Sequence, residues 1–526
     1  MTTHKITTGP LKVKSALVIV ALASVAGAAF DLLARNQLPG LGFVLFAGSI
    51  ALSVPLVRRP RRRETYLLLA AAWSLAAWVT VRSADYLAAI NICAALLLLS
   101  AAASSEVYAV RIGLWRVRDH VRSWLAQVAA VCAGASTPIA QLLRQRSNAR
   151  IDGAMPYLRG FVFAVPVFVV FALLLASADS MFADFLDGAI PSFDISIGQT
   201  GEHLIWIAAF AWIAAGFYVF IAQPERSSAG RVPPDAASGT WAAPTAKPPT
   251  ATGGRVGYIE VMIVLSSVCA LFALFVTFQF AYLFRGAAQI DLPGVTYAQY
   301  ARAGFFQLLA VAVMTAALVW FALEAVGGSI EGRRLTAFRI AGTLMIVLTG
   351  VILISALKRL GLYEEAYGFT RLRLLSHVFA YLIAGVLTLL LAQVYWERRH
   401  LFLAGTIGLG FVALTALNAI NPDAYIAAQN LARPSAMKKV DFGDGNGRYL
   451  GYISELSPDA VPTVLNQYAA SPRDAVYEKQ LATWICWYVD PGVGWREWSL
   501  GRSKSKAAAK RAGFGPHSQR CREYTG

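Results

Sequence analysis

The stretch LKRLGLYEEAYGFTRLRLLSH, residues 357–377, lies between two long apolar runs at 340–357 and 376–395. This stretch, called the connector below, is the densest cluster of charge in the more hydrophobic half of the chain. A charged side chain beside hydrocarbon is costly unless it is paired or has a function. The connector is therefore the best candidate for a functional surface, and the apolar runs beside it predict membrane-spanning helices.

Apolar runs of similar length recur along most of the chain. The protein has 526 residues, of which 57% are hydrophobic and 15% charged, a composition unlike that of a soluble enzyme. Each run has enough apolar residues to cross a hydrocarbon core about 30 Å thick. The predicted spans are 15–34, 38–57, 66–81, 86–103, 160–178, 204–223, 257–284, 303–326, 340–357, 376–395 and 401–419. The sequence thus predicts an all-α polytopic membrane protein with about eleven transmembrane helices.

The net charge of +17 indicates membrane topology and not nucleic-acid binding, because basic residues flank the spans and favour alternate loops. With the N-terminus inside, the cytoplasmic segments hold 25 Lys and Arg residues and the outer loops hold 8, and the rest lie in the tail after residue 420. The expected location is the bacterial cytoplasmic (inner) membrane, crossed many times, with the C-terminal tail outside. The first apolar run also resembles a cleaved secretory signal, but we favour an uncleaved helix because further spans follow.

The predicted spans and the segments between them divide the chain into six parts. Apolar residues recur at helical spacing between 110 and 125 with arginines between them, which predicts a basic amphipathic helix on the anionic inner leaflet. The Pro-, Ala- and Ser-rich segment after residue 223 predicts a disordered linker. Cys486 and Cys521 both lie in the tail, where a disulfide is allowed. The parts are a four-helix membrane unit (1–103), a basic cytoplasmic amphipathic segment (104–159), helices five and six (160–223), the linker (224–256), a five-helix core (257–420) and a small outward-facing C-terminal tail domain (421–526).

Two arginines of the connector lie where local rules disfavour them. Arg371 and Arg373 are expected at the outer start of a helix that Thr370 caps after a break at Gly368. There the helix dipole and the positive-inside bias both oppose a cation. The helix dipole and the positive-inside bias also oppose Arg302, at the outer start of the span 303–326.

These cations predict an anion nearby, which the sequence alone does not identify. Arg373 and His377 are four residues apart and share a helix face, so together they can hold a lipid phosphate, a substrate carboxylate or a carboxylate of the protein. One interpretation is an internal ion-pair network, and the other is a ligand site. The candidate ligand-binding residues are Arg302, Arg371, Arg373 and His377. The candidate ion-pair partners are Asp179, Asp184, Glu364 and Glu365, of which the last two can also pair with Lys358 and Arg359.

Several separated motifs resemble a known family. They are FAYLF at 280–284, the segment YAQYARAGFF at 297–306, the connector, NPD at 421–423, YL at 449–450, LSPDAVP at 456–462 and WREWSL at 495–500. Together they resemble the bacterial integral membrane proteins numbered 4173 among the domains of unknown function. The resemblance implies a multi-span membrane protein with an outward tail and supplies no activity. Gln299 and Gln307 stand where that family favours acidic residues, which argues against proton handling there.

Common catalytic signatures are missing, including HExxH, GxSxG, the Walker loop and CxxC. We therefore expect no catalytic residue, metal or cofactor, and we interpret the protein as a non-enzymatic envelope scaffold or sensor. The alternative is a transporter or lipid-handling protein with an outward site for an anionic ligand. A membrane enzyme that uses Glu364 or Glu365 ranks third, because no nucleophile accompanies them. The expected partners are membrane lipids, including the anionic inner leaflet, and an envelope protein, and not nucleic acid.

Overall fold

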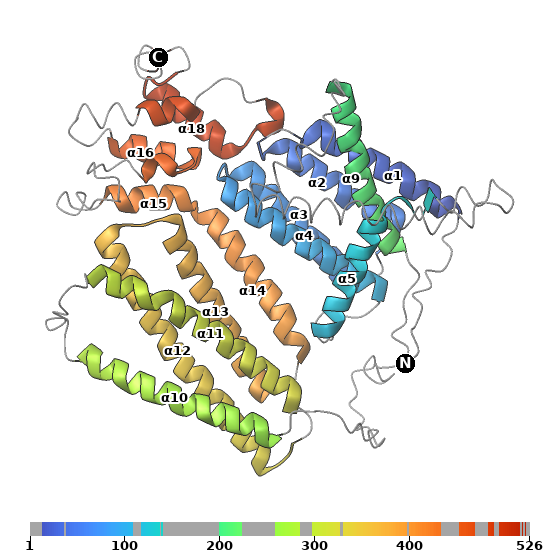
Figure 1. Cartoon of the computed structure of the whole chain (residues 1–526). Helices are drawn as coiled ribbons and strands as arrows, with labels where there is room; N and C mark the ends of the chain where they lie inside the picture. The colour runs from blue at the N-terminus through green and yellow to red at the C-terminus, as the bar shows by residue number, and fades with distance from the viewer. Residues whose placement is uncertain are drawn as a thin grey trace, which may run out of the picture. The chain divides into compact units, whose positions relative to one another are not determined.

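Figure 1 shows the computed structural model of the chain. The structure describes residues 13–35, 38–60, 62–108, 117–136, 138–139, 199–222, 258–284, 297–326, 330–396, 399–432, 452–468, 482–488, 494–515, 518 and 521. All regular elements in these ranges are helices, and no strand occurs within them.

Nine helices in the described ranges are long and apolar enough to cross a membrane. They are α1 (Val13–Leu33), α3 (Arg63–Val81), α4 (Asp85–Tyr108), α9 (Gln199–Ala222), α10 (Tyr258–Phe284), α11 (Tyr297–Val326), α12 (Arg333–Tyr367), α13 (Arg371–Tyr395) and α14 (Arg399–Ile420). A further apolar helix, α2 (Leu41–Val57), has 17 residues, the lower limit for a span. The chain is therefore a multi-pass membrane protein. The predicted span at 160–178 lies outside the described residues, so the total of eleven is not confirmed.

The chain divides into two compact units, and the first comprises residues 1–232 and 492–500. In it α1 packs along α9 and α2, and α3 packs along α4. A Cβ on Gly27 of α1 would lie 2.2 Å from the carbonyl oxygen of Ile207 in α9, so only glycine permits this approach. Small residues allow such close packing of helices in lipid.

Residues 117–125 of the predicted basic amphipathic helix lie in α5 (Val117–Ala133) of this unit, and residues 110–116 lie outside the described residues. It packs against α9 and α4, and the indole nitrogen of Trp212 in α9 donates a hydrogen bond to the carbonyl oxygen of Cys132 (3.1 Å). A Cβ on Gly216 would lie 2.4 Å from the backbone of Ala130. One side of α5 is therefore covered by protein. The prediction of a helix on the inner leaflet did not include these protein contacts.

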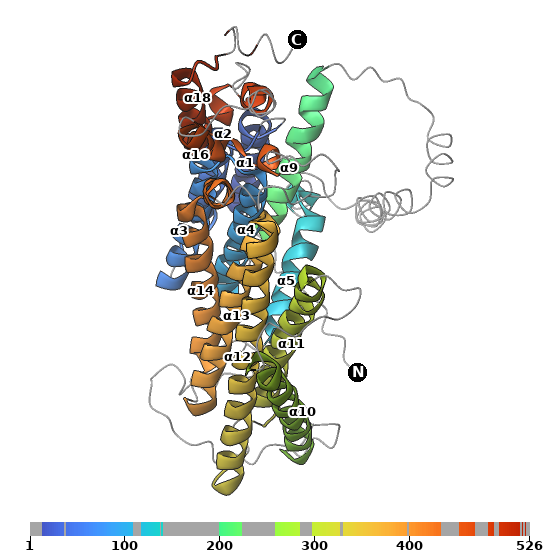
Figure 2. The ribbon, with the colours of Figure 1, turned by 90° about the vertical axis from the view of Figure 1, so that its left-hand side faces the viewer.

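The second unit comprises residues 233–491 and 501–526. The helices α10 to α14 run alongside one another in both ribbon views (Figures 1 and 2). Their core is apolar, and the side chains of Ala312, Met345, Ala356 and Leu390 are fully buried in it. The first of the boundaries between the units, after residue 232, falls within the predicted linker, 224–256.

The helix α12 begins at Arg333, before the predicted start at 340, and extends ten residues beyond the predicted end at 357, to Tyr367. The buried positions Ile352, Ala356, Leu360 and Glu364 recur every four residues, so one face of the helix stays covered beyond the apolar run. The connector is therefore partly helical. It consists of the last turns of α12, a break at 368–370 and the first turns of α13.

The C-terminal segment adds α15 (Pro422–Leu431), α16 (Val461–Tyr468), α18 (Leu500–Arg511) and the 3-10 turns η5 (Ile453–Glu455), η6 (Pro458–Ala460) and η7 (Trp495–Glu497). A second apolar cluster, with Ile426, Leu456, Val464 and Ile485 buried, packs α15, α16, α18, η5 and η6 together. Both ribbon views show α15 and α16 beyond the ends of α13 and α14 (Figures 1 and 2). Cys486 and Cys521 form a disulfide in this cluster.

The short turn η7 belongs to the first unit. There the backbone N–H of Leu41 donates to the carbonyl oxygen of Trp498 (3.0 Å), and the N–H of Leu38 donates to the carboxylate of Glu497 (3.3 Å). The predicted tail, 421–526, is therefore shared between the two units and is not a single body.

Candidate functional site: the break between α12 and α13

The site is the three-residue break at 368–370, which separates α12 from α13. Gly368 ends α12 with φ at 79°, a left-handed conformation that favours glycine. Thr370 caps α13, because its side-chain oxygen accepts a hydrogen bond from the backbone N–H of Arg373 (3.4 Å). The predicted helix break and cap are therefore confirmed.

Arg371, the first residue of α13, pairs with Asp423 of α15. Its Nε and one terminal nitrogen donate to the two carboxylate oxygens of Asp423 at 2.9 and 2.7 Å. The Asp423 side chain is only 1% exposed, whereas that of Arg371 is 28% exposed. Such two-point pairing is the strongest geometry available to arginine and a carboxylate. It gives the cation that local rules disfavour an anion within the protein.

The local sequence at 421–423 explains why Asp423 lies there. Asn421 is in the left-handed region with φ at 59°, and its side chain accepts a hydrogen bond from the N–H of Ala424 (3.4 Å) as the N-cap of α15. Pro422 occupies the first helical position, where its missing N–H costs nothing. Asp423 is therefore in the first turn, where the helix dipole favours a carboxylate.

The backbone groups of the break are satisfied by side chains from the C-terminal segment. Asn430 of α15 accepts a hydrogen bond from the N–H of Phe369 (2.7 Å) and donates to its carbonyl oxygen (2.8 Å). The hydroxyl of Tyr452 accepts from the N–H of Arg371 (2.6 Å), and Asp423 also accepts from the N–H of Ser457 (2.8 Å). Burial raises the pKa of Tyr452, an effect that its bond from Arg371 only partly offsets. We call Phe369, Arg371, Asp423, Asn430, Tyr452 and Ser457 the clamp.

Arg373 and His377 have separate partners within the protein. The Arg373 guanidinium donates to the carbonyl oxygen of Gly368 and lies 4.2 Å from the centre of the Tyr363 ring, a cation–π geometry. Nδ1 of His377 lies 3.3 Å from a carboxylate oxygen of Glu364, which is 5% exposed. The sequence had suggested that Arg373 and His377 hold one anion together. In the structure the two side chains have different partners.

The remaining predicted residues are not brought into the clamp. Arg302 is in α11, but its side chain lies outside the described part of the structure, as do Asp179 and Asp184. Glu365 is exposed in the last turn of α12. Of the predicted carboxylates, Glu364 pairs with His377.

Sequence reasoning missed the carboxylate that pairs with Arg371. Asp423 is 52 residues further along the chain, and the motif at 421–423 had been noted only for its family resemblance. Its Asx cap, proline and acidic residue are a helix-start signal that could have drawn attention to Asp423. Nothing in the sequence indicated that Asn430 and Tyr452 would satisfy the backbone of the break.

The described part of the chain holds no group of three His, Cys, Asp or Glu side chains arranged to bind a metal ion. The clamp is built from hydrogen bonds and one ion pair, and its geometry is suited to holding segments together. The clamp joins the start of α13 to α15 and to the turns η5 and η6.

The chain was compared with protein-family models, curated proteins and solved structures, and the first comparison gives a match. A family model described as "Domain of unknown function (DUF4153)" matches residues 69–467, which include the clamp. The number 4173, to which the motifs pointed, is not confirmed. No curated protein and no solved structure matches the chain.

Proposed function

The chain belongs to the family described as Domain of unknown function (DUF4153), and we propose that it is a non-enzymatic scaffold or sensor of the bacterial envelope. Its membrane helices anchor the protein, and the part of the C-terminal segment that packs in the second apolar cluster faces outward and recruits a protein partner.

The pair of Arg371 and Asp423 carries this proposal. A site for an anionic ligand requires cations that are open to the ligand, whereas Arg371 binds Asp423 through two hydrogen bonds. Arg373 and His377 also have partners within the protein. These contacts support a structural role for the connector and count against the transporter or lipid-handling alternative.

The outward direction of the C-terminal segment has two supports. Basic residues favour the predicted cytoplasmic loops by 25 to 8, which orients the N-terminus inside. The disulfide between Cys486 and Cys521 suits an oxidising compartment such as the periplasm. With the inner membrane as the proposed location, both observations support a periplasmic position for the clamp and α16.

A candidate contact for a partner is Trp487, which follows the disulfide cysteine. Its side chain is 78% exposed, although its neighbour Trp484 is buried in the apolar cluster of the C-terminal segment. Tryptophan is enriched among the residues that dominate binding energy at protein interfaces. Trp487 is therefore the position at which to search for a partner.

The experiment is photo-crosslinking in living cells. A photoreactive amino acid at Trp487 is expected to give a discrete protein adduct, and the variant Asp423→Ala, which loosens the clamp, is expected to reduce it. The same amino acid at Lys510, exposed on α18, is the matched control for proximity. The proposal fails if Trp487 yields no adduct, or only one that Lys510 yields equally.

The transporter alternative has its own test with the purified protein. If Arg371 serves an anionic ligand, Arg371→Ala weakens the binding of anionic lipid or solute, and Asp423→Ala strengthens it by releasing the guanidinium. A scaffold shows neither change in binding.

A further inference from the structure

An apolar crevice runs between α2, α3 and α4 of the first unit. It encloses about 570 Å³ of empty space, part of which is open to the surroundings. Phe46 and Ile50 of α2, Trp73 of α3 and Leu96 of α4 line it. Trp73 and Leu96 are also largely exposed, so the crevice opens toward the lipid side of the helices.

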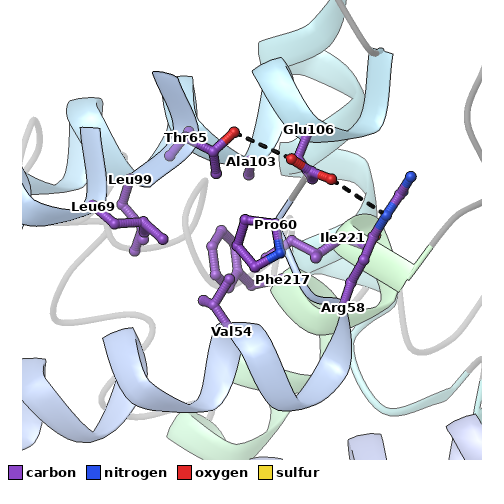
Figure 3. Close-up of a pocket in the computed structure, with 11 residues that line it drawn as sticks. Val54, Arg58, Pro60, Thr65, Leu69, Leu99, Ala103, Glu106, Phe217 and Ile221 are labelled. Carbon is purple, nitrogen blue, oxygen red and sulfur yellow. Dashed lines mark hydrogen bonds and ion pairs between the residues drawn. The ribbon is translucent and has the colours of Figure 1, made fainter. Parts of the chain in front are cut away.

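The crevice continues into a second, smaller cavity near the turn between α2 and α3 (Figure 3). Leu69 and Leu99 line both cavities. The far end of the second cavity is polar, because the Glu106 carboxylate accepts a hydrogen bond from the Thr65 hydroxyl (3.2 Å) and lies 3.8 Å from Nε of Arg58. The crevice therefore has an apolar body and one charged end.

The length of the crevice fits a lipid acyl chain. Along α2 its lining residues run from Phe43 to Val54, a distance of about 16 Å at the helical rise of about 1.5 Å per residue. One leaflet of a hydrocarbon core about 30 Å thick provides about 15 Å for an acyl chain. The apolar body thus extends through the depth of one leaflet.

The charged end has an excess of positive charge. Residues 58–63 contain five arginines, and Glu64 and Glu106 are the acidic residues beside them, so three positive charges remain. Arg58 lines the second cavity and is directed to Glu106. Arg59 and Arg63 do not line it, but they flank the lining residue Pro60 in the turn and are exposed. Basic pockets between membrane helices bind the phosphate of anionic lipids, and guanidinium groups suit phosphate oxygens.

We propose that this crevice binds one anionic phospholipid, with an acyl chain between α2, α3 and α4 and the phosphate at Arg59 and Arg63. The site is separate from the clamp and does not depend on the scaffold role. An acyl chain explains the apolar body, and the phosphate explains why the arginines gather at one end of it.

The test measures quenching of tryptophan fluorescence by lipids with brominated acyl chains. The protein is reconstituted in phosphatidylcholine with a small, equal fraction of brominated phosphatidylglycerol or brominated phosphatidylcholine. The Trp73 contribution is the difference between the native protein and Trp73→Phe. Brominated phosphatidylglycerol is expected to quench it more strongly, with a preference on the order of fivefold for each arginine that contacts the phosphate.

Two pairs of variants separate the two parts of the site. Arg59→Ala with Arg63→Ala is expected to abolish the preference, whereas Arg333→Ala, an exposed arginine of α12, leaves it unchanged. Ala47→Leu with Ala95→Leu, which fills the crevice, is expected to reduce quenching by both lipids, whereas Ala70→Leu at an exposed site on α3 does not.

Three results would overturn the proposal. The first is equal quenching of the native protein by the two lipids, a result that does not depend on the folding of any variant. The second is full quenching after the crevice is filled, which would limit the contact to the headgroup. The third is loss of the preference on adding inorganic phosphate alone, which would identify a site for free phosphate.

Discussion

The guanidinium of Arg371 and the carboxylate of Asp423 face each other through two hydrogen bonds, of 2.9 and 2.7 Å, across 52 residues of sequence. The carboxylate oxygen that accepts the shorter one also accepts the backbone N–H of Ser457. One buried acidic side chain therefore connects the start of α13, the start of α15 and the turns that follow.

Loss of this pair is expected to release the C-terminal segment. Arg371→Ala leaves the 1% exposed carboxylate of Asp423 without its cation, and such a loss costs about 3–5 kcal/mol. Asp423→Ala is expected to cost less, because Arg371 is 28% exposed and can reach water. The measurement is hydrogen exchange at residues 452–460, which reports local opening.

The double variant tests whether the two effects share one cause. Arg371→Ala with Asp423→Ala is expected to cost clearly less than the sum of the two single changes. Additive costs would show that the residues act independently and would refute a coupled pair.

Tyr452 is expected to make the attachment sensitive to alkaline pH. Burial raises the pKa of its hydroxyl in the folded protein, above the value of about 10 expected when unfolded. The stabilising contribution is therefore complete below about pH 10 and is lost as the pH rises through the folded pKa. Hydrogen exchange or proteolysis of the segment across this range should show the loss, and Tyr452→Phe should remove that dependence.

The disulfide is expected to hold the end of the C-terminal segment in place. Cys486 and Cys521 are 35 residues apart, a loop for which the chain-entropy estimate is about 3–4 kcal/mol. Cys486→Ser with Cys521→Ser, or a reductant, should speed proteolysis of this segment, and Cys93→Ser should not. Alkylation of both thiols in unreduced, intact cells would contradict the bond.

Labelling with a membrane-impermeant thiol reagent is expected to reveal the orientation. In a background without the free cysteines Cys93, Cys132 and Cys269, Ser503→Cys on α18 should react in intact cells. Arg333→Cys at the start of α12 should react only after lysis, because the positive-inside rule places it in the cytoplasm. Both positions are exposed, so the reverse pattern would invert the topology.

Several local features of the fold were readable from the sequence. The apolar runs predicted the described spans, and the Gly368 break and the Thr370 cap were placed correctly. The end of α12 was predicted too early in the chain. Hydropathy falls at Lys358, whereas one face of the helix stays buried through Glu364. Burial of a polar residue depends on what packs against it, which a hydropathy pattern does not contain.

The sequence alone determined that the chain crosses a membrane many times, because a helix in hydrocarbon satisfies its own backbone hydrogen bonds and needs only a long enough apolar run. It also determined that Arg371 needs an anion. Only the tertiary structure decided that Asp423 is that anion. The reason is physical: α13 and α14 bring the two residues together, and the strength of their pairing depends on distance and burial, neither of which is a local property of the sequence.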